Sequence, residues 1–174
     1  MTEALRLHIR PIEMRDAQAL HALRIMPGVQ ETISSVYSER LSGAEAFIAS
    51  FTGDDHHFVA ETEHAAGQLT VVGTVGLHVS AKPRKRHMGV LGIMVHTDWQ
   101  GKGVGRRLLE RILDLADNWL MLRRVELVVF ASNARAIKLY KSFGFEAEGC
   151  LRAASIMNGA YVDELVMGRV LKTS

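Results

Sequence analysis

A turn with three glycines in five residues joins a strand pattern to a long helix pattern near the middle of this 174-residue sequence. The turn reads WQGKGVG, with glycines at positions 101, 103 and 105, and the strand pattern before it ends at His96. The first amides of a helix have no partner inside the helix and carry partial positive charge, so the turn presents several N–H donors to an anion. Taken alone, the glycines also fit a flexible turn without a ligand.

Two familiar nucleotide-binding patterns do not fit this turn. A nucleoside-triphosphate loop requires Gly-Lys followed by Ser or Thr, but Lys102 is followed by Gly103. The dinucleotide fingerprint expects a parallel strand at the start of a βαβ unit and an acidic residue about twenty residues later at a strand end. Neither condition is well met, so the anion has to be identified from other residues.

Composition predicts one soluble globular domain spanning residues 1–174. Hydrophobic residues make up 48% of the chain, and no repeat or linker divides it. No apolar run reaches the roughly 18 residues of a membrane span, and the N-terminus has no signal-peptide core. Cys150 is the only cysteine, which excludes an intrachain disulfide. These features predict a cytoplasmic protein with no membrane partner.

Hydrophobic periodicity predicts a mixed α/β fold, with a mostly antiparallel central sheet of about seven strands flanked by about four helices. The expected strands cover residues 5–12, 56–63, 69–80, 88–96, 125–130, 146–151 and 161–170. The expected helices begin at Arg15, Ser42, Val104 and Asn133. A turn at Gly67 separates the second strand from the third, and the second to fourth strands form an antiparallel meander.

Three finer expectations concern individual elements. Ser42 and Glu45 have the spacing of a capping box at the start of the second helix. Trp119 continues the apolar spacing of the 104–120 helix and is expected to face inward. The stretch VELVVF at 125–130 is almost continuously apolar, as in a mid-sheet strand that is covered on both faces.

The residues around the turn resemble the GCN5-related N-acetyltransferases, the GNAT family. The pyrophosphate-binding turn of that family reads Arg/Gln-x-x-Gly-x-Gly/Ala, and Gln100, Gly103 and Gly105 occupy these positions. The stretches LHIRPIEMRDAQAL, GIMV and VELVVFASNARAIKLYKSFGF extend the resemblance to nearly the whole chain. Within the family, DNWL, RVELVVF and NGAYVDELVMGRV are most similar to bacterial L-amino acid N-acetyltransferases, which are cytoplasmic enzymes that acetylate free amino acids.

The resemblance implies acetyl-CoA as co-substrate, no metal, and a role for each residue of the motif. The main chain expected to hold the pyrophosphate comprises Gln100, Gly101, Lys102, Gly103, Val104 and Gly105. The main chain expected to meet the pantetheine arm and the thioester carbonyl comprises Ile93, Met94 and Val95, and a donor there would stabilise an oxyanion. Tyr140 would protonate the departing thiolate. Asn133 would contact the cofactor arm and also cap its helix.

Several side chains have a structural alternative. Tyr140 lies on an amphipathic helix and could instead be an aromatic residue of the hydrophobic core. The side chain of Met94 could likewise simply pack in the core. No general base is identified, because VLGIMVH contains no carboxylate. A water chain is one alternative base, and the others are three histidines that also fit a solvated surface, His78, His87 and His96. Three acidic residues could help bind an acceptor ammonium, but solvated charges are the preferred interpretation for them: Glu31, Asp163 and Glu164.

The basic turn at Lys82–His87, KPRKRH, is compatible with three roles. It could bind nucleic acid, lie near the carboxylate of an anionic acceptor, or be an ordinary solvated turn. No aromatic platform is interleaved with its charges, and the net charge of the chain is only +2. We therefore do not expect a nucleic-acid partner.

Three functional hypotheses follow from the resemblance. The favoured one is transfer of acetyl from acetyl-CoA to the primary amine of a small molecule, a free L-amino acid, by direct attack in a ternary complex. The alternatives are acetylation of a protein or peptide N-terminus and a non-catalytic module that senses CoA. The resemblance implies that the loops between the first two helices build the acceptor pocket. Relatives commonly pair through their C-terminal strands, so a homodimer is expected.

Overall fold

The computed structural model describes residues 6–63 and 69–171. Its strands are β1 (Leu7–Pro11), β2 (Asp55–Glu63), β3 (Leu69–Val79), β4 (Met88–Val95), β5 (Arg124–Phe130), β6 (Glu146–Met157) and β7 (Ala160–Val170). Its α-helices are α1 (Ala17–Arg24), α2 (Leu41–Ala49), α3 (Val104–Asp114) and α4 (Ala134–Lys141). The expected elements are all present, whereas Leu5 of the first strand pattern and the expected turn at Gly67 lie outside the described residues.

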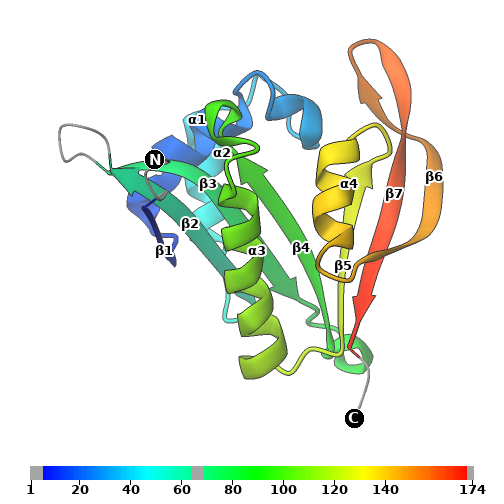
Figure 1. Cartoon of the computed structure of the whole chain (residues 1–174). Coiled ribbons are helices and arrows are strands. Elements are labelled where there is room, and N and C mark those ends of the chain that lie inside the picture. The colour runs from blue at the N-terminus through cyan, green and yellow to red at the C-terminus, as the bar shows by residue number, and fades with distance from the viewer. Residues whose placement is uncertain (1–5, 64–68, 172–174) are drawn as a thin grey trace, which may run out of the picture. The chain divides into compact units, whose positions relative to one another are not determined.

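The seven strands form one mixed sheet in the order β1-β2-β3-β4-β5-β7-β6. Strand β1 pairs antiparallel with β2, and β7 pairs antiparallel with both β5 and β6, between which it runs (Figure 1). Strands β4 and β5 are parallel, with Gly89 opposite Val125. Along β3 and β4, the Ser80 N–H donates to Met88 and the His96 N–H donates to Val72, a register that runs antiparallel. The expected mixed, mostly antiparallel sheet is therefore confirmed.

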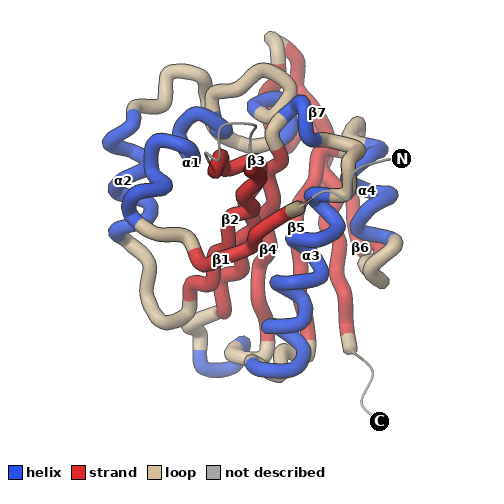
Figure 2. The backbone as a smooth tube through the Cα atoms, turned by 60° about the vertical axis from the view of Figure 1, so that its left-hand side comes forward, coloured by secondary structure: helices blue, strands red, loops and turns tan. Residues whose placement is uncertain are grey.

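The chain groups into two compact units. The first unit comprises Met1–Gly76 and Ile93–Leu113, and the second comprises Leu77–Gly92 and Asp114–Ser174. In the first unit, α1 and α2 lie side by side (Figure 2). They bury a cluster of apolar side chains, Ala17, Leu20, Ala44 and Ile48.

The start of α2 differs from the expected capping box. The helix begins at Leu41, and its N-cap residue Arg40 makes no side-chain capping bond. Ser42 therefore lies inside the first turn rather than at the cap, where its hydroxyl would have to meet an orphan amide. The expectation that Ser42 and Glu45 form a capping box is wrong, although the helix itself is confirmed.

The helix after the glycine turn changes geometry before it ends. Val104, Leu108 and Ile112 are buried as the spacing predicts, but α3 stops at Asp114 and a π-helix follows over Leu115–Trp119. Its i→i+5 bond, from the Leu120 N–H to the Leu115 carbonyl, widens the turn and moves later side chains off the α-helical face. Trp119 is consequently 76% exposed, and the expectation that it faces inward is wrong.

Strand β5 is covered less completely than expected. It lies mid-sheet between β4 and β7, and Val125, Leu127 and Val129 are buried. Val128, which points to the opposite face from its neighbours, is 52% exposed. The mid-sheet position is confirmed, but the expectation of cover on both faces is wrong. At the end of α4, Gly144 adopts a φ of 84° and stops the helix as expected.

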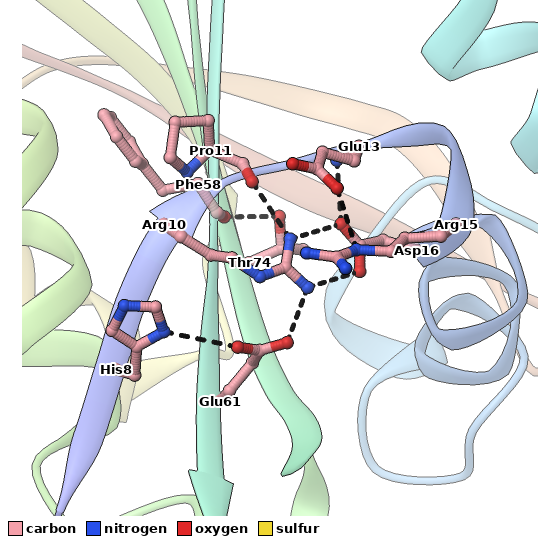
Figure 3. A network of polar contacts seen from close by, with 9 residues as sticks. All are labelled: His8, Arg10, Pro11, Glu13, Arg15, Asp16, Phe58, Glu61 and Thr74. Carbon is pink, nitrogen blue, oxygen red and sulfur yellow. Dashed lines mark hydrogen bonds and ion pairs between the residues drawn. The ribbon is translucent and has the colours of Figure 1, made fainter.

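A buried ion cluster joins β1, β2 and the approach to α1 in the first unit (Figure 3). The Arg10 guanidinium donates to both carboxylate oxygens of Asp16, at 2.7 and 2.8 Å, and to Glu61 at 2.5 Å. The side chains of Asp16 and Glu61 are only 5% and 8% exposed. Burial alone would raise the pKa of Asp16, but the hydrogen bonds from Arg10 and from the Glu13 N–H lower it overall. The Arg10 hydrogen bond lowers the pKa of Glu61 as well.

A second ion pair fixes the π-helix in the second unit. Arg169 of β7 donates to both carboxylate oxygens of Asp117 at 2.7 Å, and to the Phe143 carbonyl at 3.0 Å. These bonds tie the widened turn to β7 and to the end of α4. Throughout the part of the chain that is described, none of the helices has both the length and the apolar character needed to span a bilayer.

Candidate active site

The glycine turn has the open backbone geometry that an anion requires. Strand β4 ends at Val95, a short 3₁₀ helix covers Thr97–Trp99, and α3 begins at Val104. Gly101 and Gly103 have φ values of 74° and 89°, which side chains other than glycine rarely adopt. A Cβ atom built at either glycine would meet nothing within 4 Å, so the space beside this backbone is empty of protein atoms.

The amides of the turn are available as donors. The first backbone hydrogen bond into α3 is donated by Arg107 to the Gly103 carbonyl, at 3.1 Å. Within residues 6–63 and 69–171, the five N–H groups from Gly101 to Gly105 have no protein acceptor. The positive end of α3 adds to their attraction for negative charge. These residues can therefore receive an anion, and their binding of the pyrophosphate of a CoA ester stays a prediction.

Close packing on β3 holds the start of α3 in place. A Cβ atom at Gly73 would lie 3.0 Å from the Met94 carbonyl oxygen, 3.1 Å from Leu108 and 3.2 Å from Val104. A larger side chain here would push these neighbours apart by a few tenths of an ångström, so glycine allows the close approach of the strand to the helix start. Gly73 was not among the residues predicted from the sequence, although a glycine inside a strand pattern is a recognisable signal for a close backbone approach.

The side chain of Gln100 supports the turn from behind. Its amide group donates to the Val95 carbonyl at 3.1 Å and to the Gly28 carbonyl at 3.2 Å. The neighbouring Thr97 hydroxyl donates to the Pro27 carbonyl at 2.6 Å. Lys102 is exposed, with its ammonium 5.1 Å from the centre of the Trp99 ring. The bonds to Pro27 and Gly28 could not be predicted from local sequence patterns, because they span about 70 residues.

The strand residues expected to meet the pantetheine arm lie at the end of β4. The parallel register with β5 runs from Met88 to Val90, and Ile93–Val95 lie further along the strand. Ile93, Met94 and Val95 are half-buried, and Met94 also packs against the α1–α2 cluster. The Met94 side chain thus packs in the hydrophobic core, in agreement with the structural alternative.

Asn133 and Tyr140 lie in the second unit, on and just before α4. The Asn133 side chain accepts a hydrogen bond from the Ala136 N–H at 3.1 Å, so its role as helix cap is confirmed. Tyr140 is 6% exposed, and its ring centre lies 5.9 Å from that of Phe145. Burial raises the pKa of Tyr140 to about 12. The phenol is therefore protonated at neutral pH and can act as a proton donor.

The remaining candidate residues make local contacts. The His96 ring accepts a bond from the Asp98 N–H at 3.2 Å, while His78 and His87 are exposed. Glu31 accepts from the Gly28 N–H at 2.6 Å, and Asp163 accepts from the Ala153 N–H at 2.8 Å. Glu164 accepts from the Ser155 hydroxyl. The basic turn Lys82–His87 is an exposed connection that contains a short 3₁₀ helix at Pro83–Lys85.

Comparison with known proteins agrees with this geometry. The model of the acetyltransferase (GNAT) family matches residues 23–145. The L-amino acid N-acetyltransferase AaaT of Escherichia coli K12 is 34% identical over 172 residues, which cover 93% of this chain and 96% of the relative. The N-alpha-acetyltransferase RimI of Mycobacterium tuberculosis H37Rv is 32% identical over 66% of this chain and 68% of its own length.

A solved structure extends the similarity to the whole fold. The spermidine N-acetyltransferase of Vibrio cholerae, in complex with CoA and spermine, superposes with a TM-score of 0.80 at 27% identity. The match covers 94% of this chain and 95% of that one. With the family model spanning most of the chain and an N-acetyltransferase aligned over nearly all of it, this protein belongs to the GNAT family and is an N-acetyltransferase.

Proposed function

We propose that this enzyme transfers the acetyl group of acetyl-CoA to the primary amine of a free L-amino acid by direct attack in a ternary complex. The observation that carries the proposal is the row of five amides at Gly101–Gly105 that have no acceptor among the described residues, which suits the diphosphate of the acetyl donor. Similarity to the Escherichia coli L-amino acid N-acetyltransferase over 93% of the chain supports the acceptor class.

Each part of the chain then has a defined task. The main chain of Gln100, Gly101, Lys102, Gly103, Val104 and Gly105 holds the pyrophosphate. The main chain of Ile93, Met94 and Val95 aligns the pantetheine arm, and Asn133 contacts it. Acetyl-CoA supplies an activated acyl carbon, to which the amine nitrogen bonds as the carbon–sulfur bond breaks. Tyr140 gives its phenolic proton to the departing sulfur and regains one from solvent, while the protons that the nitrogen loses pass to solvent along a water chain.

Charge in the segment between α1 and α2 favours an amino acid over a polyamine. We place part of the acceptor pocket there, at residues 27–40. Glu39 of this segment is neutralised by Arg24 at 2.7 Å, and Glu31 is engaged by the Gly28 N–H. The whole chain carries a net charge of +2, which does not attract a polycation. A peptide N-terminus is the second candidate acceptor, because of the similarity to RimI.

The proposal extends to assembly and location. Strand β6 lies at one end of the sheet and exposes Leu151 and Ile156, while Tyr161 is exposed on β7. An exposed apolar edge of this kind favours pairing with a second copy, so we expect a homodimer. Cys150 is a free, exposed thiol, which suits the reducing cytoplasm where acetyl-CoA is made available.

An acceptor screen tests the proposal. Purified protein is incubated with acetyl-CoA and, separately, with L-amino acids, polyamines, aminoglycosides and short peptides, while thiol release is followed. We expect amine-dependent release that is fastest with an L-amino acid. If thiol release is fastest with a polyamine or a peptide, that compound class is the acceptor instead of an L-amino acid. If CoA binds but no amine causes thiol release, the protein is a CoA sensor rather than an enzyme. If calorimetry detects no heat of binding with CoA, the proposed diphosphate site is wrong.

A further inference from the structure

The glycine turn proposed to bind the diphosphate, Gln100–Gly105 (the diphosphate turn), is bonded directly to the segment that follows α1. The Thr97 hydroxyl donates to the Pro27 carbonyl at 2.6 Å, and the Gln100 side-chain amide donates to the Gly28 carbonyl at 3.2 Å. Thr97 and Gln100 belong to one turn, because the Gln100 N–H bonds back to the Thr97 carbonyl at 3.2 Å. Two consecutive carbonyls of the 27–40 segment are therefore held by the residues just before Gly101.

The contact is close as well as polar. Gly28 has a φ of 83°, and a Cβ atom there would lie 2.8 Å from the Thr97 hydroxyl oxygen. No other residue type fits this position without strain or a clash. The Gly28 N–H donates to Glu31 at 2.6 Å, so both ends of this residue's backbone are fixed. Thr97 and Gln100 thus fix a bend in the backbone at the start of the 27–40 segment.

The start of the 27–40 segment is also held by the Met26 carbonyl, which accepts hydrogen bonds from the Val29 and Gln30 N–H groups at 3.1 and 2.9 Å. Val29 is the only buried side chain in this range, all of which is described. At the far end, the Glu39 carbonyl bonds to the His21 ring at 2.8 Å and its carboxylate pairs with Arg24. Between the two ends, Val36 and Tyr37 are exposed. A stretch with so little burial depends on its anchor points for its arrangement.

We propose that Thr97 and Gln100 are positioning residues that couple occupation of the diphosphate turn to the order of the 27–40 segment. This inference rests on the proposed function, which places the acetyl donor on the turn and part of the acceptor pocket on the segment. A diphosphate bound to the amides from Gly101 onward restrains the adjoining peptide of Gln100. Gln100 and Thr97 transmit that restraint to the Gly28 and Pro27 carbonyls. Donor binding then raises acceptor affinity and, by thermodynamic linkage, the acceptor raises donor affinity by the same factor.

Hydrogen exchange with CoA as the probe tests the coupling without knowledge of the acceptor. In the wild-type protein, saturating CoA should slow exchange at the amides of residues 101–105 and also at those of residues 28–39, the latter by about fivefold or more. In Thr97→Val, which keeps the shape but lacks the donor, CoA should still protect the turn while protection of residues 28–39 falls. Thr97→Ser keeps the hydroxyl and should restore it.

Thr32→Val is the matched control. The Thr32 hydroxyl also donates to a carbonyl of this segment, that of Val29 at 2.6 Å, but makes no bond to the diphosphate turn. This variant should keep the CoA-dependent protection of residues 28–39. Equal loss in Thr32→Val and Thr97→Val would overturn the proposal, because general loosening of the segment would then explain both.

Steady-state kinetics supply a second readout. With the best acceptor from the screen, Thr97→Val should raise the acceptor KM at saturating acetyl-CoA by about fivefold or more, while the CoA dissociation constant measured without acceptor stays within about twofold of wild type. Protection of residues 101–105 without protection of 28–39 in the wild-type protein would overturn the coupling alone. No heat with CoA and no protection at 101–105 would overturn the proposed function and the coupling together.

Discussion

Arg10 binds Asp16 through two parallel hydrogen bonds of 2.7 and 2.8 Å and is the shared partner of Asp16 and Glu61. Because both carboxylates are buried, the guanidinium is what makes their burial tolerable. The pair lies where the chain passes from β1 to α1 and so fixes the direction in which α1 starts.

Replacement of Arg10 by methionine should destabilise the protein by about 3 kcal/mol, since it leaves two buried carboxylates without a cation. Urea unfolding followed by circular dichroism measures the change. Arg15→Met is the matched control, because Arg15 pairs with Glu13 at 2.8 Å on an exposed surface and should cost less than about 1 kcal/mol. Equal losses in the two variants would contradict a special role for the buried cluster.

Stability should fall on acidification because the pKa values of Asp16 and Glu61 are lowered in the folded state. The unfolded chain then binds more protons than the folded one, so this contribution is complete above the unfolded values of about 4 and is lost as the pH falls below them. Urea midpoints measured between about pH 6 and pH 3 should show the loss. In Arg10→Met the slope should be smaller, and an unchanged slope would assign the acid sensitivity to other groups.

The sequence predicted the elements well because each one has a periodic apolar pattern of its own. It also predicted the open glycine turn before α3, since glycine spacing and helix polarity are local properties of Gly101–Gly105. The π-helix at Leu115–Trp119 was not predicted, because one widened turn does not interrupt the apolar spacing before it. The Arg10–Glu61 bond and the bonds from Thr97 to Pro27 and from Gln100 to Gly28 were not predicted, for another reason. They join residues 51 to 72 positions apart, and a single sequence carries no record of such pairs.

Tyr140→Phe should reduce kcat by about 10²–10⁴-fold while CoA affinity stays unchanged, because only the phenolic proton is lost. Within the described part of the chain the hydroxyl has no hydrogen-bond partner, so the variant should fold normally. With the pKa of Tyr140 raised to about 12, the phenol remains protonated across the usual assay range, and the wild-type rate should show no loss from its ionisation up to about pH 10. Stopped-flow thiol release and calorimetry with CoA measure the two effects. A kcat within about threefold of wild type would exclude Tyr140 as the acid.

Gly103→Ala should weaken CoA binding more than its effect on stability explains. The substitution forces a side chain into a backbone conformation with φ near 89°, which costs roughly 1–2 kcal/mol in any context, and it also places a methyl group beside the amides that would hold the diphosphate. Gly144→Ala supplies the control, since Gly144 has a φ of 84°, also has open space around its Cβ position, and lies at the end of α4. Both variants should lose similar stability in urea, whereas only Gly103→Ala should raise the CoA dissociation constant, by about tenfold or more if one amide contact is lost. If calorimetry finds the same CoA affinity in both variants, the glycine turn does not hold the diphosphate.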